Sequence, residues 1–496
     1  MALDRKDIRA KLDPDLHQAL RNDDAGAREG EGGVKNDYLD HIARKLSTVP
    51  ATGIVGGFSV PGSLFPHQSA LTAWALRRGR AAIFADTGLG KSRMQLAWAD
   101  AVRKHTKRPV LILAPLAVAA QTVAEGVQIG VEVAHCRDGS ETPGHPIVIT
   151  NYDRLHRFAP ADFGAVVLDE SSCIKHHDAK TLRTLLTAFR DTPFKLCATA
   201  TPAPNDWTEL GTHAEFLGVC TRQEMLAEFF CHDGGDTSVW RLKGHARGLF
   251  WRWVCQWGAL VRKPSDLGFD DSAYELPPLH VHEHTVSTEM PENEGMLFAD
   301  EAQTLSERRF ARKFSVSDRV AECAAMVNSD AEPWVVWCDL NAEGDALTKA
   351  IPGAVQIAGA DSADVKERRL QDFAAGKFRV LVSKPSICGF GLNWQHAARM
   401  AFVGVTDSFE AYYQAVRRCW RFGQKQDVHV HVFASSAEGA VVSNLRRKER
   451  DAQIMSENLS AETHDAVMQE VTGTKRDTNI YNAVHLVKVP AFLDAP

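Results

Sequence analysis

Short apolar runs alternate with longer segments of helical periodicity over most of the chain. In the first series the apolar runs cover residues 81–85, 110–114, 146–150, 165–168 and 195–198, and segments 68–78 and 91–104 have helical periodicity. Continuous apolar runs that alternate with helices are typical of a parallel sheet covered on both faces. The pattern therefore predicts an α/β domain that begins near residue 61.

A second series of the same kind follows a break at Leu276, Pro277 and Pro278. Its apolar runs are 334–337, 354–357, 379–383, 400–403 and 428–433, and its helical segments include 342–351, 364–375 and 408–418. The fold class that we predict is α/β, with two tandem lobes built on parallel sheets.

The stretch between the two series has a helical texture and is rich in aromatic residues. Its tryptophans, among them Trp240 and Trp257, could stack on bases, but packing in a core is the expected role. At about 150 residues per domain, 496 residues allow two or three domains. We expect a polar N-terminal extension at 1–60, a first lobe at 61–205, a helical insertion at 206–276, a second lobe at 277–450 and a C-terminal extension at 451–496.

Composition narrows the possible classes of protein. The hydrophobic fraction of 44% and the charged fraction of 24% are those of a soluble globular protein. A net charge of -6 excludes a polycation but leaves nucleic-acid binding open, since a basic stripe can lie on an acidic protein. No signal-peptide pattern or apolar stretch of about 20 residues is visible, so we expect a cytoplasmic protein without membrane contact.

Cysteines and basic clusters add little chemistry. The ten cysteines form no Cys-x-x-Cys pair, which favours reduced thiols over a disulfide framework or zinc ribbon. The basic clusters are expected mainly on solvated helix faces, with contact to nucleic-acid phosphates as the alternative. These clusters lie at 77–80, 103–104, 308–309 and 446–448.

Residues 85–92 have the sequence ADTGLGKS, between an apolar run and a helical segment. This strand–loop–helix context is that of a phosphate-binding loop, in which backbone N–H groups and a helix N-terminus face the phosphates of ATP. Ala85 stands where the strict pattern has glycine. Lys91 is expected to reach the β- and γ-phosphates and Ser92 to hold Mg²⁺. The expected ATP-binding positions in this loop are Thr87, Gly88, Gly90, Lys91 and Ser92.

Two carboxylates follow the apolar run 165–168 directly. Acids at the carboxyl end of a buried strand lie where ligands bind in open α/β sheets. We expect Asp169 to coordinate Mg²⁺ and Glu170 to orient or polarise the attacking water. An N-cap pair for the next helix is the alternative.

Together with these two motifs, several others occur in one order along the chain. The first half contains LFPHQ at 64–68, APL at 114–116, ITNY at 149–152 and ATATP at 198–202. In the second half, GFGLN at 389–393 precedes QAVRRCWRFGQ at 414–424. From residue 61 to residue 450 this order resembles the superfamily 2 helicase-like ATPases. It is closest to the Swi2/Snf2 branch, which is related to the DEAD/DEAH-box helicases, and within that branch to compact phage- or prophage-type members.

The resemblance implies two RecA-like lobes and further site residues. Gln68 would read adenine, because its amide offers one donor and one acceptor. Gly391 and Gln414 would contribute to the ATP site. Arg418 and Arg421 are three residues apart and share a helix face, and they would act as arginine fingers from the second lobe.

Three departures from the Snf2 pattern stand out. Residues 85–87 replace the usual Asp-Glu-Met, and Arg417 stands where an aspartate is usual. Ser171 and Ser172 replace the usual Ala-His or Gly-His, which removes a histidine that often links the acidic pair to the other motifs. None of the three removes a phosphate-binding, metal-binding or finger residue.

Histidines alternate at His280, His282 and His284, and again at His429 and His431. On a strand each set would share one face, so the first set could bind zinc. The polar face of an edge strand is the preferred interpretation, and cross-strand pairing of the two sets is possible.

The function expected from these features is a DNA-stimulated ATPase that requires ATP and Mg²⁺ and moves along duplex DNA without sequence preference. One alternative is a strand-separating helicase on DNA or RNA. Another is a nucleotide-gated scaffold that recruits phage replication or recombination proteins.

Overall fold

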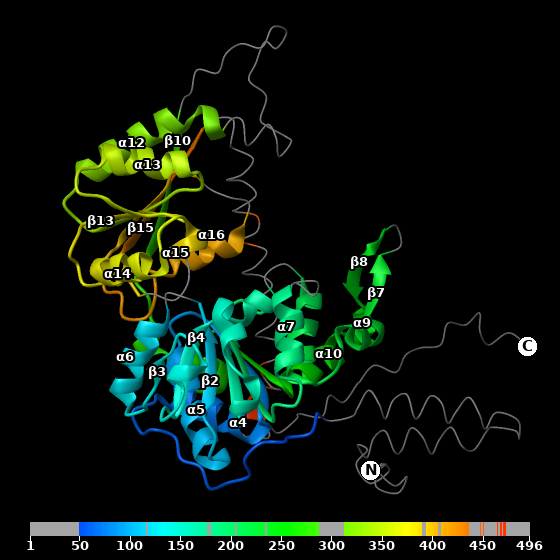
Figure 1. Cartoon of the computed structure of the whole chain (residues 1–496). Helices are drawn as coiled ribbons and strands as arrows, with labels where there is room; N and C mark the ends of the chain where they lie inside the picture. Colours follow the sequence, from blue (N-terminus) through cyan, green and yellow to red (C-terminus); the bar gives the residue numbers. More distant parts are fainter. Residues whose placement is uncertain are drawn as a thin grey trace, which may run out of the picture.

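The computed structural model describes most of both predicted lobes. The described residues are 49–115, 118–175, 180–203, 206–233, 236–286, 312–388, 393–404 and 408–435, with 447, 450, 464, 467, 468 and 470–472. Figure 1 shows the two lobes one above the other, with the first lobe below. Each contains a parallel sheet with helices on its faces, so the predicted fold class is confirmed.

Lobe 1 is built on a seven-stranded sheet in the order β3-β4-β2-β5-β6-β1-β9, with every pair parallel. The strands are β1 (Arg80–Ala85), β2 (Val110–Ala114), β3 (Ala134–His135), β4 (Ile147–Asn151), β5 (Ala165–Asp169), β6 (Phe194–Thr199) and β9 (Gly258–Val261). Alternate side chains of β1 enter different cores, Ala81 and Ile83 on one face and Ala82 and Phe84 on the other. This two-sided burial explains the continuous apolar runs.

Helices cover both faces of this sheet. One face packs against α4 (Pro66–Arg78), α5 (Lys91–Thr106) and α6 (Ala119–Ile129). The other packs against α7 (Lys180–Ala188), α8 (Leu210–Leu217), α9 (Arg222–Phe229) and α10 (Arg247–Cys255). Residues 206–255 therefore extend the core of lobe 1 instead of forming a separate body.

The segment 206–276 is not purely helical, in contrast to the expectation. It contains the antiparallel hairpin of β7 (Phe230–Asp233) and β8 (Asp236–Leu242), and β9 joins the lobe 1 sheet beside β1. Trp251 and Trp257 are buried in the core, as expected of packing residues. A four-residue strand that directly follows an aromatic helix lacks the turn residues that would mark it in the sequence.

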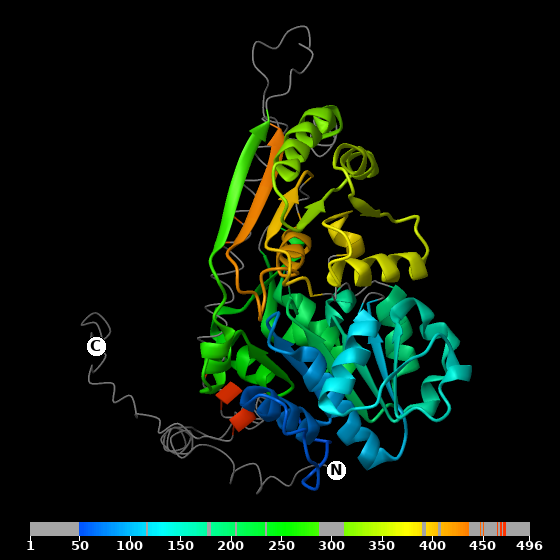
Figure 2. The same ribbon diagram turned by 90° about the vertical axis from the view of Figure 1, so that its left-hand side faces the viewer.

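Lobe 2 has a six-stranded parallel sheet in the order β10-β15-β14-β11-β13-β12. Its strands are β10 (Leu279–Val286), β11 (Trp334–Trp337), β12 (Val355–Ile357), β13 (Val380–Ser383), β14 (Arg399–Phe402) and β15 (Val428–Ser435). One face packs against α14 (Ala363–Ala374), α15 (Pro385–Cys388) and α16 (Phe409–Val416). The other packs against α12 (Val316–Asn328) and α13 (Asn341–Ala350). Figure 2 shows β10 and β15 side by side along the edge of this lobe.

Described residues of the predicted C-terminal extension pack on lobe 1. Val467 and Val471 are buried in the core that contains α4, and Glu470 forms an ion pair with Arg78. The neighbouring Arg77 and Arg80 donate hydrogen bonds to backbone carbonyls. The basic cluster at 77–80 therefore makes contacts within the molecule. No helix among the described residues is long and apolar enough to span a bilayer.

Candidate active site between the lobes

The predicted phosphate loop joins the carboxyl end of β1 to the first turn of α5. Gly88 and Gly90 have φ angles of 93° and 82°, in the left-handed region that favours glycine. At Gly90 a Cβ atom would also collide with Nε2 of Gln68. The loop thus needs glycine at this position for both backbone conformation and space.

Lys91 is buried at the start of α5. Its Nζ donates to the backbone oxygens of Ala85 at 2.9 Å and Asp86 at 3.3 Å. Burial lowers the pKa of Lys91, although the nearby carboxylates Glu170 and Asp169 favour its charged form. Two backbone carbonyls therefore hold the ammonium group inside the loop. A bound phosphate could take their place as its hydrogen-bond acceptor.

Asp169 and Glu170 lie at the carboxyl end of β5, next to β6. Gln95 from α5 donates to Oδ1 of Asp169 at 2.6 Å. Burial and then the charge of Glu170 raise the pKa of Asp169 to about 7. Glu170 is one of two described non-glycine residues with positive φ, at 49°. Such strained backbone is concentrated at functional sites, where the surrounding structure holds it.

Gln68 lies against the phosphate loop but has partners within lobe 1. Its Oε1 accepts from the backbone N–H of Phe65 at 3.1 Å, and its Nε2 donates to the backbone oxygen of Leu89 at 3.0 Å. The first bond caps α4 and the second ties α4 to the loop. The amide therefore has a structural role besides its predicted contact with adenine, which stays a prediction.

The predicted arginine fingers follow α16 in lobe 2, where Arg418 is buried and Arg421 is partly buried. Arg418 donates from Nε and Nη2 to the backbone and side-chain oxygens of Gln414 at 3.2 and 3.3 Å. Burial is the main cause that lowers the pKa of Arg418 and that of Arg421 to about 10. Gln414 thus holds Arg418 through two hydrogen bonds. Its contact with nucleotide stays a prediction.

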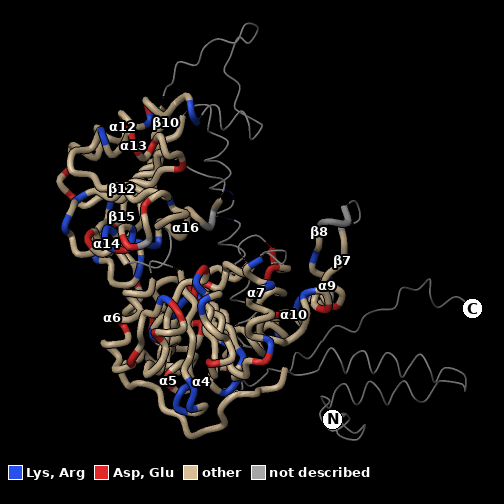
Figure 3. The backbone as a smooth tube through the Cα atoms, in the orientation of Figure 1, with Lys and Arg blue, Asp and Glu red and all other residues tan. Residues whose placement is uncertain are grey.

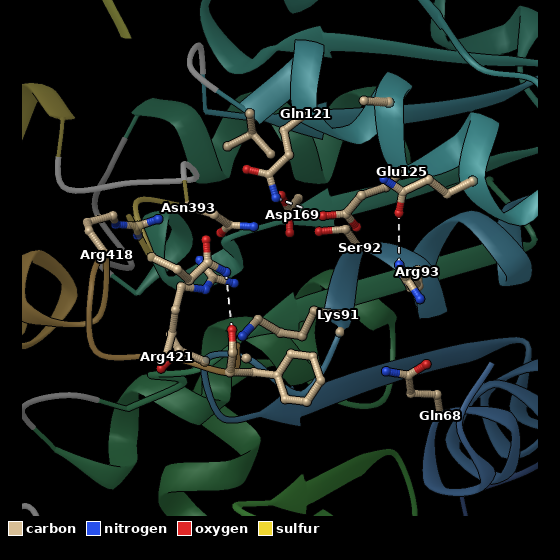
Figure 4. A pocket seen from close by; sticks show the side chains of 18 of the residues that line it. Gln68, Lys91, Ser92, Arg93, Gln121, Glu125, Asp169, Asn393, Arg418 and Arg421 are labelled. Carbon is tan, nitrogen blue, oxygen red and sulfur yellow. Dashed lines mark hydrogen bonds between the residues drawn. The ribbon is translucent and has the colours of Figure 1, made fainter. Parts of the chain in front are cut away.

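The two sets of residues meet in a cleft of about 360 Å³ between the lobes. Figure 4 shows Arg418 and Arg421 on one side of it and Lys91, Ser92 and Asp169 on the other. Pockets for small ligands usually measure about 300–1,000 Å³. Gln68, Thr87, Gly88, Gly90 and Glu170 also line the cleft. Of the predicted site residues, Gly391 lies outside the described residues.

Several buried polar atoms at this cleft lack a hydrogen-bond partner among the described residues. They are Oε2 of Glu170, Oδ1 of Asn393 and Nε of Arg421. Nε2 of Gln414, whose side-chain oxygen accepts from Arg418, also lacks a partner. Buried polar groups are normally satisfied, so such a group indicates a ligand or water that belongs there. Donors from arginine and acceptors from carboxylate suit a Mg²⁺–nucleoside triphosphate, which offers phosphate oxygens, metal and metal-bound water. The residues present therefore fit this group.

Sequence reasoning missed part of the cleft wall. Gln121 and Glu125 come from α6, where Gln121 donates to Glu125 at 2.7 Å. Tyr274 and Phe422 pack their rings together, with centroids 4.7 Å apart. Asn393 is part of the quoted GFGLN motif, so a signal for it existed. Phe422 likewise lies within the quoted motif at 414–424. Gln121, Glu125 and Tyr274 carry no local motif and reach the cleft only through the tertiary fold.

An imidazole lies beside the acidic pair although the sequence lacks the usual histidine there. His213 of α8 is fully buried, and its Nε2 is 3.1 Å from Oγ of Ser171. Its ring also meets the edge of Phe84 at 5.2 Å. Burial lowers the pKa of His213 to about 4. His213, which comes from the segment 206–276, thus contacts Ser171, the first of the two serines that follow the acidic pair.

The alternating histidines lie on the edge strand β10 and its neighbour β15. His280 pairs in register with His429 and His282 with His431, which confirms both the edge strand and the cross-strand pairing. His282 shares a hydrogen bond of 3.1 Å with His429, and His284 one of 3.0 Å with His431. In the part of the chain that the structure describes, no group of three or more metal-binding side chains is arranged to hold an ion.

Comparison with known proteins found a family match and similar solved structures. Residues 334–423 match the family described as the helicase conserved C-terminal domain. The predicted resemblance to helicases is thereby confirmed for these residues of lobe 2. A search of curated proteins found no match. A similar solved chain is the Sulfolobus solfataricus SWI2/SNF2 ATPase core in complex with dsDNA. Its identity is 18% and its TM-score 0.38, with 84% of this chain and 98% of that chain covered.

Proposed function

We propose that this chain hydrolyses ATP with Mg²⁺ in the cleft between its lobes and couples hydrolysis to movement along duplex DNA. The observation that carries the proposal is the meeting of Lys91, Asp169 and Glu170 from lobe 1 with Arg418 and Arg421 from lobe 2 around one cleft. The helicase C-terminal domain match over lobe 2 supports the same conclusion.

Each group has a role that its chemistry allows. Lys91 would bind phosphate oxygens in place of the carbonyls of its own loop. Ser92 and Asp169 would hold Mg²⁺, which would neutralise phosphate charge when bound. Glu170, with one carboxylate oxygen free of partners among the described residues, would accept a hydrogen bond from the attacking water. Arg418 and Arg421 would stabilise negative charge as it develops.

The two-lobe arrangement supports the proposed coupling to DNA. Because the fingers and the phosphate loop belong to different lobes, hydrolysis would require a closed cleft, and opening would follow product release. Nucleic acid held by both lobes would then move with each cycle. Figure 3 shows basic and acidic positions mixed over both lobes, in keeping with the net charge of -6. We therefore expect modest DNA affinity that falls steeply with salt.

The first test is phosphate release with and without duplex DNA, for the wild type and for Lys91→Ala. We expect DNA to stimulate the wild type and the variant to lose activity. Lys104→Ala is the matched control, because Lys104 lies near the far end of the same helix with its side chain 59% exposed. An unchanged rate in Lys91→Ala would show that the site assignment is wrong.

Movement is tested separately from hydrolysis. Displacement of a third strand from a triplex, without unwinding of a duplex, would support translocation on duplex DNA. Unwinding would instead indicate a strand-separating helicase. Absence of stimulation by any nucleic acid would favour the nucleotide-gated scaffold.

A further inference from the structure

Two of the three departures from the Snf2 pattern contact each other between the lobes. Asp86 lies in the phosphate loop of lobe 1, and Arg417 ends α16 in lobe 2. Nη2 of Arg417 is 3.0 Å from Oδ2 of Asp86, and the hydroxyl of Tyr413 donates to Oδ1 of Asp86 at 2.6 Å. The aspartate therefore has partners on both oxygens from the opposite lobe.

The surroundings make this ion pair stronger than a surface pair. The side chain of Arg417 is only 12% exposed, and its guanidinium lies over the rings of Tyr413 and Trp420 at 5.2 and 4.6 Å. Burial disfavours the charged form of Asp86, but Arg417 and Tyr413 outweigh it and keep the pKa of Asp86 below its usual value. Because the pair is shielded from water, the attraction between its charges is stronger than in an exposed pair.

Both partners are connected directly to catalytic segments. Oδ1 of Asp86 also accepts from the backbone N–H of Thr87 at 2.6 Å, inside the phosphate loop. Arg417 is next to Arg418 in the chain. Close by, a Cβ atom on Gly88 would lie 3.1 Å from Cβ of Phe422, so the loop and the finger segment are already in close packing.

We infer that Asp86, Arg417 and Tyr413 form an interlobe latch that positions the two arginine fingers over the phosphate loop when the cleft is closed. The inference rests on the proposed function, since it assigns positioning residues for the same reaction. The latch residues act through Arg418 and Arg421, and neither Asp86 nor Arg417 lines the wall of the cleft. A charge pair of this kind is specific for the closed state because it breaks when the lobes separate.

Charge reversal tests the latch. Asp86→Arg and Arg417→Asp should each lower kcat about 10- to 100-fold by displacing the fingers, because small misplacements have effects of this size. Binding of a fluorescent ATP analogue should change much less, since most of the groups expected to hold phosphate and metal stay in lobe 1. The double variant Asp86→Arg/Arg417→Asp restores an ion pair and should recover at least about tenfold of the loss in kcat. Tyr413→Phe, which removes only the hydroxyl, should have a smaller effect.

The control is Lys377→Asp, which reverses a charge in an exposed ion pair with Asp372 within lobe 2 and should leave kcat unchanged. Hydrogen exchange of the peptides 84–92 and 409–422 measures the contact without turnover. Both single variants should exchange faster in both peptides, and the double variant should regain protection. A double variant no better than the worse single variant, in kcat and in exchange, would overturn the latch. Restored protection in a protein without ATPase activity would refute the proposed function and leave the contact standing.

Discussion

The buried histidine beside the acidic pair gives a prediction whose magnitude follows from the structure. His213 has no exposed surface, and burial lowers its pKa from about 6.5 in the unfolded chain to about 4 in the folded protein. The unfolded chain therefore binds a proton between these values that the folded protein does not bind. By linkage, the stability associated with His213 is complete above pH 6.5 and is lost as the pH falls toward 4.

The size of the loss follows from the two pKa values. At pH 5 the unfolded imidazole is almost fully protonated and the folded one is almost fully neutral. The free energy of unfolding should then be about 2 kcal/mol lower than at pH 7 on account of this residue alone. Replacement by glutamine removes the titrating group, so His213→Gln should lack this part of the acid sensitivity.

Hydrogen exchange of peptides from α8, measured at increasing urea concentrations at pH 7 and pH 5, reports the unfolding of lobe 1. The variant should be less stable than the wild type at pH 7, because the contacts with Ser171 and Phe84 change, and the difference should shrink by about 2 kcal/mol at pH 5. His156→Gln changes an exposed histidine of the same lobe and controls for the substitution itself. Equal losses of stability between pH 7 and pH 5 in wild type and His213→Gln would refute the reasoning.

Two further predictions concern buried charges. Glu170→Gln keeps the size of the side chain but removes the carboxylate, so phosphate release should fall about 10²- to 10⁴-fold while binding of a fluorescent ATP analogue persists; a rate close to that of the wild type would contradict the assigned role. Arg319 and Glu343 form an ion pair of 2.8 Å with neither side chain exposed, inside lobe 2. Arg319→Met should lower the free energy of unfolding by about 3–5 kcal/mol, because it leaves the buried carboxylate of Glu343 without its cationic partner. The double variant Arg319→Met/Glu343→Leu should regain most of this loss. Urea denaturation followed through lobe 2 peptides measures both variants, and a loss below about 1 kcal/mol in the single variant would count against the burial argument.

The strands that could be predicted are those buried on both faces. The apolar runs at 110–114 and 334–337 coincide with β2 and β11, because a central parallel strand needs apolar side chains at every position. The two-residue β3 is too short to show a pattern. The strand β9 lies close behind the aromatic helix α10, and no turn residues separate the two in the sequence. The hairpin of β7 and β8 is stabilised by pairing with itself, and its residues carry neither clear alternation nor a sustained apolar run.

The site was predictable where its chemistry is local. Lys91 and Ser92 follow a glycine loop, and Asp169 and Glu170 end a strand, so both pairs can be read from adjacent residues. Gln121 and Glu125 reach the cleft only because α6 packs beside the phosphate loop. The partners of Gln68 and Gln414 were also beyond the sequence, since an amide serves a backbone carbonyl, an arginine or a nucleotide equally well.

At each of the three departures from the Snf2 pattern, one residue has a polar partner far away in the sequence. Asp86 and Arg417 form an interlobe ion pair, and Ser171 contacts an imidazole of His213. In each case a local motif differs while a contact joins the altered position to a residue far away in the sequence. A buried charge or polar group without a partner is costly, so a change at one position is tolerated when another position supplies the partner. A comparison of motifs treats each segment alone and therefore counts such changes as separate lost residues. In the folded chain, Asp86, Arg417 and Ser171 each have a polar partner.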